Sequence, residues 1–512
     1  MAETVKLFVN GQEVEVESGK NLIDALGAVG IDIPHLCYHP ALGADGNCRM
    51  CLVGIEDGRP PVVPACKTQV AEGMKVLLDA DHIKKIQRDI MELELINHPI
   101  DCPICDQAGE CSLQDYYMKY DGQSSRMREV KVPKDKKIDF GCGVVHDQER
   151  CIACARCVRF TRNITKTGEL GLVNRTDLTR VNIFPGRPLN NRYALNVVDL
   201  CPVGAMTSSD FRFKQRVWFL AKDKSVCHGC SKGCSIYVDH NKEKYKDDII
   251  YRYRPRPNEF VNGYFMCDAG RMTYKQENND RITKGRVNGK KTTSTLAVDA
   301  LKQAISQSGK KVFLLSPESS LEELIAVKKL AEQTGAALSG YSEGYIVTDD
   351  GDDFLIQDDK SANRAGLELL GLDTGKQFLE TALKDAELLV CFANKLPDIT
   401  NNEGLKELIG DCTLAVVSAY TSPVAEYAEI VVPAASFTES EGSIINCDNI
   451  LQHFAKAVKK NEPFADLVTI AGQLGGEIHT NALAWIELNK SVDVLKDVKC
   501  DLIPEQGLAL NS

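Results

Sequence analysis

The sequence predicts a multidomain chain that combines α+β and α/β architecture, and three observations support this prediction. First, 512 residues exceed what one hydrophobic core usually supports, so several domains are expected. Second, most of the 20 cysteines gather in closely spaced groups within residues 37–267. Third, strand-like and helical segments alternate beyond about residue 290, which is typical of an open α/β domain with a largely parallel sheet.

The N-terminal segment predicts a small β-grasp domain. Apolar and polar residues alternate in Val5–Val9 and Glu13–Val16, and Asn10-Gly11 between them suits a two-residue hairpin turn. Residues 20–30 are expected to form a short helix. The first cysteines follow this helix directly, so we expect them in a loop that the small domain holds in place.

Three further segments carry local signals. Apolar residues recur at helical spacing over 81–97, and His98-Pro99 ends this predicted helix, so the histidine lies at a helix–loop junction. Residues 119–140 are polar and rich in lysine, which predicts a linker. Arg252–Pro257 interleaves arginines with a tyrosine, and we expect it at the surface or in a subunit contact.

The C-terminal half predicts a parallel sheet. One helix is expected at Leu321–Thr334, between buried strands. The expected strands are Lys311–Ser316, Leu388–Ala393, Leu414–Ser418 and Ile430–Pro433.

Composition argues against several classes of function. The net charge of −11 disfavours nucleic-acid binding. The N-terminus lacks the apolar core of a signal peptide, so we expect a reducing compartment, where clustered cysteines bind metals. No stretch reaches the ~18 consecutive apolar residues of a membrane span, so membrane association is expected only through partners. Dinucleotide-binding, P-loop and nucleophile-elbow motifs are absent from the sequence, and no residue is predicted to be catalytic.

Fifteen cysteines and one histidine form four groups whose spacing suits metal ligation. The groups are Cys37, Cys48, Cys51 and Cys66; His98, Cys102, Cys105 and Cys111; Cys151, Cys154, Cys157 and Cys201; and Cys227, Cys230, Cys234 and Cys267. The remaining cysteines are isolated, and free cysteine commonly packs as a small apolar side chain. They are Cys142, Cys391, Cys412, Cys447 and Cys500.

The first group favours a [2Fe–2S] cluster. Its spacing is C-x10-C-x2-C-x14-C, whereas zinc sites generally pair two tight knuckles, to which Cys37 and Cys66 do not belong. Gly43 and Gly46 allow backbone amides to approach the sulfurs of such a cluster.

The third group resembles half of a bacterial two-cluster ferredoxin. In such a ferredoxin the run C-x2-C-x2-C-x3-C-P lends its fourth cysteine to the second cluster. Here Thr161 takes that place after Cys151, Cys154 and Cys157, and Cys201-Pro202 supplies the remote ligand. One ligand set therefore remains, which predicts a single [4Fe–4S] cluster.

The ligands and spacing of the second and fourth groups distinguish less clearly between zinc and an iron–sulfur cluster. His98 with three cysteines suits either zinc or a [4Fe–4S] cluster, and an imidazole ligand would raise the potential of the cluster. The fourth group has the spacing C-x2-C-x3-C-x32-C, found at the front of molybdopterin enzymes, and favours [4Fe–4S] over zinc. His228 lies between its ligands and stays unassigned.

The order of these groups, followed by an α/β tail, resembles the large iron–sulfur subunit of respiratory complex I, NADH:quinone oxidoreductase. The motifs that carry the resemblance are His98–Cys111, Arg150–Phe160 and Ala428–Gly442. It implies an electron relay within an oxidoreductase rather than its catalytic centre. Electrons would enter at the Cys37 cluster, pass to the Cys151 cluster and then to the His98 cluster. The Cys227 cluster would lie off this route in a structural role.

The resemblance also implies partners and a location. Electrons would arrive from a flavin- and NADH-binding subunit and leave to a ferredoxin-like two-cluster subunit, among other peripheral-arm subunits. The chain would lie on the cytoplasmic side of the bacterial inner membrane, bound only through these partners. The tail of about 245 residues is shorter than in many relatives, so no molybdopterin is expected.

Five domains are expected under this resemblance. They are a plant-type [2Fe–2S] ferredoxin-like domain (1–78), a [4Fe–4S] domain with one histidine and three cysteine ligands (79–118), a ferredoxin-like [4Fe–4S] domain (119–222), a molybdopterin-oxidoreductase-type [4Fe–4S] domain (223–280) and a truncated α/β domain of molybdopterin-oxidoreductase type (281–512). Three alternatives stay open. They are the diaphorase part of an NAD-linked hydrogenase or formate dehydrogenase, a molybdenum or tungsten enzyme, and a zinc-stabilised scaffold.

Overall fold

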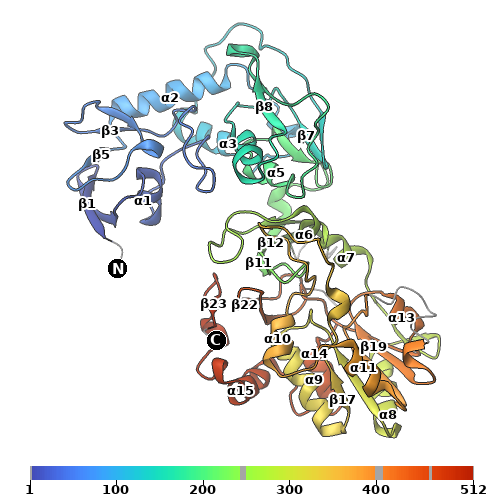
Figure 1. Cartoon of the computed structure of the whole chain (residues 1–512). Helices are drawn as coiled ribbons and strands as arrows, with labels where there is room; N and C mark the ends of the chain where they lie inside the picture. Colours follow the sequence, from blue (N-terminus) through green and yellow to red (C-terminus); the bar gives the residue numbers. More distant parts are fainter. Residues whose placement is uncertain (1–2, 243–248, 398–406, 460–463, 511–512) are drawn as a thin grey trace. The chain divides into compact units, whose positions relative to one another are not determined.

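The computed structural model of the chain divides into two compact units, Met1–Phe219 and Leu220–Ser512 (Figure 1). The structure describes residues 3–242, 249–397, 407–459 and 464–510. Each unit has hydrophobic cores of its own. No helix among these residues is long and apolar enough to cross a membrane.

Unit 1 begins with a five-stranded mixed sheet in the order β2-β1-β5-β3-β4. The strands are β1 (Thr4–Val9), β2 (Gln12–Glu17), β3 (Leu52–Ile55), β4 (Val62–Pro64) and β5 (Lys75–Leu77). β1 and β2 pair antiparallel across Asn10-Gly11, which confirms the predicted hairpin. The predicted helix is α1 (Leu22–Ala28), whose apolar side packs into the core of this sheet and whose N-cap is the side chain of Asn21.

The predicted second helix is α2 (Asp81–Leu95), and it ends before His98 as expected. A 3-10 helix η2 (Cys102–Ile104), α3 (Ser112–Tyr116) and the π-helical turn η3 (Tyr117–Asp121) follow. The polar segment after them packs against α2 instead of forming a free linker. Lys131 Nζ donates to the carbonyl oxygens of Leu95 and Ile96 at 2.7 and 2.9 Å, because the last carbonyls of a helix lack intrahelical partners.

The remainder of unit 1 is built from short elements. They are β6 (Ile138–Gly141), β7 (Val144–His146), α4 (Arg156–Arg159), η4 (Phe160–Ile164), β8 (Leu170–Val173), β9 (Arg180–Ile183), α5 (Asn196–Leu200), β10 (Met206–Ser208) and η6 (Val217–Phe219). β10, β7 and β6 form one small sheet, and β8 and β9 form a hairpin. Sequence patterns did not predict these strands, because each is too short to show alternation.

His146 on β7 makes the stability of unit 1 depend on pH. Its side chain is fully buried, its Nδ1 lies 3.2 Å from the carbonyl oxygen of Ala205, and burial lowers its pKa to about 4. The unfolded chain binds this proton near the ordinary pKa of 6.5. The contribution to stability is therefore complete above that pH and is lost as the pH falls towards about 4. At a pH of about 5.5 the loss is about 1.4 kcal/mol.

We expect His146→Gln to show a smaller fall in thermal midpoint than the wild type between about pH 7.5 and about pH 5.5, because glutamine does not titrate there. His82→Gln is the matched control, since His82 is exposed. Differential scanning calorimetry of the full chain at both pH values measures the effect. Equal pH slopes for the His146 variant and the wild type would show that this buried imidazole does not govern acid sensitivity.

Unit 2 begins with an antiparallel sheet of three strands. These are β11 (Leu220–Val226), β12 (Ser235–Asn241) and β13 (Ile250–Pro255), and the short helices α6 (Asp268–Met272) and α7 (Tyr274–Asn279) follow. Arg252–Pro257 was expected at the surface or in a subunit contact, and the surface prediction is wrong in its main part. Arg252 and Arg254 form ion pairs with buried Asp239 on the paired strand β12, and Arg256, just after β13, is only 7% exposed.

The larger part of unit 2 is a three-layer α/β domain. Its seven-stranded sheet has the order β15-β14-β20-β19-β18-β16-β17. The strands are β14 (Gly285–Val287), β15 (Lys290–Thr292), β16 (Lys311–Leu315), β17 (Ala337–Ser339), β18 (Leu388–Phe392), β19 (Thr413–Ser418) and β20 (Ile430–Pro433). The five neighbouring strands β20, β19, β18, β16 and β17 run parallel to one another. The predicted, largely parallel sheet is therefore confirmed.

Helices cover both faces of this sheet (Figure 1). One core contains residues of α8 (Ser294–Gln307), α9 (Leu321–Thr334), α14 (Leu467–Gln473) and α15 (Asn481–Ser491), and the other contains residues of α11 (Lys376–Leu383) and α13 (Pro423–Tyr427). Leu388, Val390 and Phe392 of β18 face the first core, while Leu389 and Cys391 face the second. Continuous apolar strands are typical of a sheet that is covered on both faces.

A second, three-stranded sheet lies beside the first core. It consists of β21 (Gly442–Ile445), β22 (Ile450–Phe454) and β23 (Leu508–Ala509), and α10 (Arg364–Leu369) contacts β21. The other short elements are the 3-10 helices η1 (Ala65–Lys67), η5 (Thr176–Leu178), η8 (Glu343–Tyr345), η9 (Asp493–Leu495) and η10 (Cys500–Leu502).

The five isolated cysteines do not share one environment. Cys391 and Cys412 are buried in the second core, as expected for small apolar side chains. Cys142 and Cys447 are exposed, so the same prediction is wrong for them, because both lie in tight turns at the surface. Cys500 is half-buried.

Candidate metal centres

The first cysteine group lies in the long loop between α1 and β3 and in η1. Cys37, Cys48, Cys51 and Cys66 are all buried. The backbone amide of Cys37 lies 3.4 Å from Cys48 Sγ, and the amides of Gly46 and Asn47 also stabilise the Cys37 thiolate. Gly46 has a φ of +81°, a conformation that favours glycine, so the expected approach of backbone amides to a sulfur is found there.

The thiols of this group meet in two pairs. A hydrogen bond from Cys48 lowers the pKa of Cys37 to about 5, and one from Cys66 lowers the pKa of Cys51 to about 7. The pKa values of Cys48 and Cys66 are raised, because each donates its proton to the ionised partner. Thiolates are the form that binds metal, so four thiols at this spacing suit a positively charged centre.

The second group surrounds the end of α2. His98, Cys102 and Cys111 line a cavity of about 1110 Å³, and Cys105 is buried nearby. Burial lowers the pKa of His98 to about 4, so its imidazole is neutral at neutral pH, which is the form that ligates metals. Within the described residues, His98 Nδ1 is buried without a hydrogen-bond partner. A buried nitrogen of this kind is costly unless a metal or a ligand satisfies it.

The third group combines a loop with a remote cysteine. Cys151 and Cys154 lie in the loop before α4, and Cys157 lies in the first turn of that helix. Cys201 directly follows α5. Burial raises the pKa of Cys151 to about 11 and that of Cys154 to about 12. The pKa of Cys157 is also raised, by burial and by the other three thiols of the group. Without a cation the four thiols would therefore stay protonated, whereas a metal centre would stabilise their ionised form.

Three of the four groups share one apolar core in unit 1. Cys37 and Cys48 of the first group, Cys111 of the second and Cys154 of the third belong to the same cluster of buried side chains. Direct contacts join the loops as well. The amide of Ser112 donates to the carbonyl oxygen of Pro202 at 3.0 Å, which links the second group to the third.

Two arginines that sequence reasoning did not single out join the first and third groups. Arg156 donates to the carbonyl oxygen of Tyr38 at 2.5 Å, and Arg159 donates to the carbonyl oxygens of Gly43, at 2.9 Å, and Cys37. They are three residues apart on one helix, so their side chains extend from the same face. Each arginine follows a cysteine of the third group by two positions, Arg156 after Cys154 and Arg159 after Cys157. This spacing was the one sequence feature that could have pointed to them.

Gly204 is a further residue that the sequence did not reveal. A Cβ atom at this position would lie 2.2 Å from Cys105 Sγ, far inside van der Waals contact. The loop that follows Cys201 therefore touches a sulfur of the second group, which only glycine permits.

We expect Gly204→Ala to displace Cys105 and to cost about four iron atoms per chain if the second group holds a [4Fe–4S] cluster. Gly27→Ala is the matched control, because a Cβ at Gly27 meets no atom within 4 Å. Iron analysis and circular dichroism of both variants measure the effect. Full iron content in the Gly204 variant would show that the second group holds no cluster close to this loop.

The fourth group lies in unit 2, around the β11–β12 hairpin. The amide of Cys227 donates to the carbonyl oxygen of Cys234 at 2.8 Å, and Cys267 begins α6, where its Sγ accepts from Gly270 N at 3.2 Å. A Cβ on Gly270 would lie 3.1 Å from Cys227 Sγ and 3.2 Å from Cys267 Sγ, so both sulfurs approach this glycine. Burial raises the pKa values of Cys227 and Cys234, and Cys230 adds to both shifts.

His228 has an aromatic environment, although its Nε2, like His98 Nδ1, is buried without a hydrogen-bond partner among the described residues. Its ring stacks on Phe437 with centroids 4.1 Å apart, and its Nδ1 lies 3.1 Å from the carbonyl oxygen of Val226. Burial lowers its pKa to about 4.

The residues of all four groups fit metal clusters. Each group offers four soft or imidazole donors, and none of the 20 cysteines forms a disulfide. Burial and neighbouring thiols raise the pKa values of cysteines in these groups, and a cation would stabilise their ionised form. A cation would also give His98 Nδ1 the partner that it lacks among the described residues.

Family models match four successive parts of the chain. Residues 2–80 match a 2Fe-2S iron-sulfur cluster binding domain, and residues 87–126 match the NADH-ubiquinone oxidoreductase-G iron-sulfur binding region. Residues 141–207 match the ferredoxin-like domain of NADH-quinone oxidoreductase subunit 3, and residues 220–279 match a molybdopterin oxidoreductase Fe4S4 domain. The multidomain iron–sulfur architecture that the sequence predicted is therefore confirmed.

Curated relatives agree with these matches. The NADH-ubiquinone oxidoreductase 75 kDa subunit of Reclinomonas americana is 36% identical over 340 residues, which is 65% of this chain and 48% of that protein. The G subunit of NADH-quinone oxidoreductase from Rickettsia conorii is 35% identical over 344 residues, with 65% and 49% covered. Over this shared part, the chain is similar to the large iron–sulfur subunit of NADH-quinone oxidoreductase.

A third curated relative is also similar over only part of its chain. The corresponding G subunit of Streptomyces coelicolor is 37% identical over 284 residues, which is 55% of this chain and 33% of that protein. The chain spans about half the length of the first two curated relatives. Among solved structures, a chain of an NAD+-reducing [NiFe]-hydrogenase matches with a TM-score of 0.37 at 23% identity, covering 42% of this chain and 91% of that one.

Proposed function

We propose that this chain is the iron–sulfur electron-transfer subunit of an NADH:quinone oxidoreductase, respiratory complex I. It relays electrons between other subunits and does not itself hold the catalytic centre. Its partners are a flavin- and NADH-binding subunit, a ferredoxin-like two-cluster subunit and further subunits of the peripheral arm. It acts on the cytoplasmic side of the bacterial inner membrane and is held there by these partners.

The proposed cofactors are one [2Fe–2S] cluster, held by the Cys37 group, and three [4Fe–4S] clusters, held by the His98, Cys151 and Cys227 groups. Clusters of this kind supply reversible one-electron oxidation and reduction when bound. The five domains predicted above carry these groups and the α/β tail. No molybdopterin is part of the proposal.

The single observation that carries the proposal is the apolar core shared by three of the groups. Cys37, Cys111 and Cys154 come from different groups and yet belong to one buried cluster. The contact of Gly204 with Cys105 brings the loop of the third group to the second group. Arg156 and Arg159 tie the third group to the first. A relay needs neighbouring redox sites within one rigid unit, and this arrangement favours the third group as the intermediate one.

The protein side chains supply a dry and fixed environment. Buried apolar residues such as Leu36 and Met50 keep water from the shared core, and both side chains are fully buried. The neutral imidazole of His98 carries one negative charge fewer than a thiolate, which raises the potential of its site. Burial, ligand type and hydrogen bonds to sulfur are the means by which a protein tunes such sites.

The direct test is the metal content of anaerobically purified full chain, combined with low-temperature EPR. We expect about fourteen iron atoms and a similar amount of acid-labile sulfide per chain, and EPR signals of one two-iron and three four-iron centres after reduction. Protein that is pale, poor in iron and silent in EPR after dithionite would overturn the proposal.

His98→Cys tests the histidine ligand. We expect the variant to keep its cluster but to lower the midpoint potential of that centre by on the order of 100 mV, because a thiolate adds negative charge. NADH-to-quinone turnover of the complex should slow accordingly. EPR-monitored redox titration measures the shift. An unchanged midpoint together with an unchanged rate would reject His98 as a ligand.

A further inference from the structure

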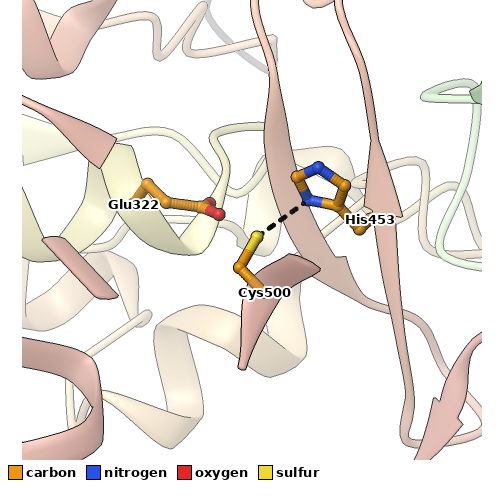
Figure 2. A group of neighbouring side chains, drawn as sticks. All are labelled: Glu322, His453 and Cys500. Atoms are coloured by element: carbon orange, nitrogen blue, oxygen red, sulfur yellow. Dashed lines mark hydrogen bonds between the residues drawn. The ribbon is translucent and has the colours of Figure 1, made fainter. Parts of the chain in front are cut away.

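Three side chains that can bind metal, and that belong to none of the four cysteine groups, meet in the α/β domain. They are Glu322 on α9, His453 on β22 and Cys500 at the start of η10 (Figure 2). One ligand atom from each lies within 4.8 Å of the other two. The Sγ atom of Cys500 and the Nδ1 atom of His453 are 3.3 Å apart. Two of these ligands lie more than 100 residues from the third in the sequence, so only the fold brings them together.

We propose that Glu322, His453 and Cys500 form a zinc-class divalent-metal site that fastens the C-terminal segment to the α/β domain.

The donor types and their spacing suit zinc. Zinc accepts cysteine sulfur at about 2.3 Å, histidine nitrogen at about 2.0–2.1 Å and carboxylate oxygen at about 2.0–2.2 Å, in a tetrahedral arrangement. Tetrahedral angles with these bond lengths separate sulfur from nitrogen by about 3.6 Å. The 3.3 Å between Cys500 Sγ and His453 Nδ1 is within a few tenths of an ångström of this separation. A water molecule would supply the fourth ligand, because His453 and Cys500 are only half-buried.

Glu322 is an unusual carboxylate. It is only 1% exposed, and among the described residues no lysine or arginine forms an ion pair with it. Buried carboxylates are normally paired with a cation or coordinated to a metal, since burial of an isolated charge is costly. A divalent cation held by Glu322, His453 and Cys500 would supply the missing positive charge.

Hydrogen bonds orient the carboxylate and leave room for a metal. Its Oε1 accepts from Trp485 Nε1 at 2.7 Å and from Ser443 Oγ at 2.9 Å, and its Oε2 accepts from Ser443 N at 2.8 Å. A carboxylate has about four acceptor positions, so one position on Oε2 stays open. Ser443 Oγ also lies 3.1 Å from His453 Nδ1, and a metal bound to this nitrogen would replace that contact. The two hydrogen bonds from Ser443 to Glu322 would remain and would hold the carboxylate in place.

The site would connect three parts of the domain. α9 belongs to the main apolar core, β22 to the second sheet, and Cys500 opens the last segment of the chain before β23. β23 is only two residues long (Leu508–Ala509) and pairs with β22 through two residues. A metal bond at Cys500 would therefore add a strong constraint to a weakly paired segment.

The test measures zinc in the full chain and in two matched cysteine variants. Wild type, Cys500→Ser and Cys412→Ser are purified, incubated with a small excess of zinc chloride, and freed of unbound metal by gel filtration. Both variants remove one thiol from the same domain, but Cys412 lies in the second core and its sulfur faces the Thr413 carbonyl oxygen. Zinc and iron are then measured together, and zinc X-ray absorption gives the number of sulfur ligands.

We expect about one zinc per chain with a single sulfur ligand in the wild type and in Cys412→Ser. Cys500→Ser should lose this zinc and keep its iron, and its thermal midpoint should no longer rise when zinc is added. His453→Gln provides a second variant with the same expected loss. Absence of retained zinc in the wild type would overturn the proposal. Zinc that persists in Cys500→Ser, or zinc bound by three or four sulfurs, would also overturn it, because the metal would then occupy a cysteine group.

Discussion

Replacement of Cys154 by alanine is expected to reduce NADH-driven quinone reduction to the background level. Cys154 belongs to the group that adjoins both the Cys37 and the His98 groups, and it lies in the core that they share. Loss of one of the four proposed ligands should remove about four iron atoms per chain and leave a gap between the other two sites. The remaining sites would then be too widely separated to exchange electrons at a useful rate.

Cys227→Ala is the informative partner of this variant. It removes a proposed ligand of the same type, also buried, but from the group in unit 2. We expect it to lower the amount of assembled complex while the turnover of each assembled complex stays close to that of the wild type. Quinone reductase activity, normalised to the flavin content of purified complex, measures both variants.

The outcomes of this pair separate the roles of the groups. Retained turnover in Cys154→Ala complex would contradict the relay through the third group. Loss of turnover in fully assembled Cys227→Ala complex would show that the fourth group also lies on the electron path.

Local patterns predicted several of the longer regular elements of the chain, but not the short strands. Leu321–Thr334 forms a helix over the predicted residues, because Ser320 and Glu323 make a capping box at its start. The parallel strands were recognisable from unbroken apolar runs such as Leu388–Phe392, which both faces of the sheet bury. The Asn10-Gly11 hairpin likewise depends on only two residues and their immediate neighbours.

Features that depend on contacts between distant residues could not be predicted in this way. The spacing of the cysteines defined four candidate groups, but it could not show that three of them share a core. That arrangement depends on Arg156 and Gly204, which touch residues about 100 positions away in the sequence. The same limit explains Cys500, which looked isolated because its neighbours Glu322 and His453 are remote in sequence. Burial of Arg256 was also hidden, because arginine in a short segment usually indicates a surface.

Arg281→Met is expected to destabilise unit 2 by about 3–5 kcal/mol, the largest effect on stability that we predict. Arg281 follows α7, and its side chain is 6% exposed. Its Nη1 and Nη2 donate to the two carboxylate oxygens of Glu439 at 2.6 and 2.7 Å, and its Nη1 lies 3.8 Å from Glu277 Oε2. The side chains of Glu439 and Glu277 are 4% and 3% exposed. Removal of the guanidinium would leave two buried carboxylates without their cation.

The two tryptophans of the chain allow the effect to be measured in one unit. Trp485 is buried in unit 2, whereas Trp218 lies in unit 1. In a Trp218→Phe background, the fluorescence of Trp485 during urea unfolding therefore reports on unit 2. Lys224→Met serves as the control, because it removes an exposed ion pair with Glu505 in the same unit and should cost less than about 1 kcal/mol.

A double variant identifies the cause of the destabilisation. If buried charge is responsible, Glu439→Gln added to Arg281→Met should restore part of the lost stability, since it removes one uncompensated carboxylate. If the loss came only from the missing packing of the arginine side chain, the second substitution would add further destabilisation. Recovery in the double variant would therefore show that the segment after α7 and the segment after β20 are held together by charge, in a domain whose main core is apolar.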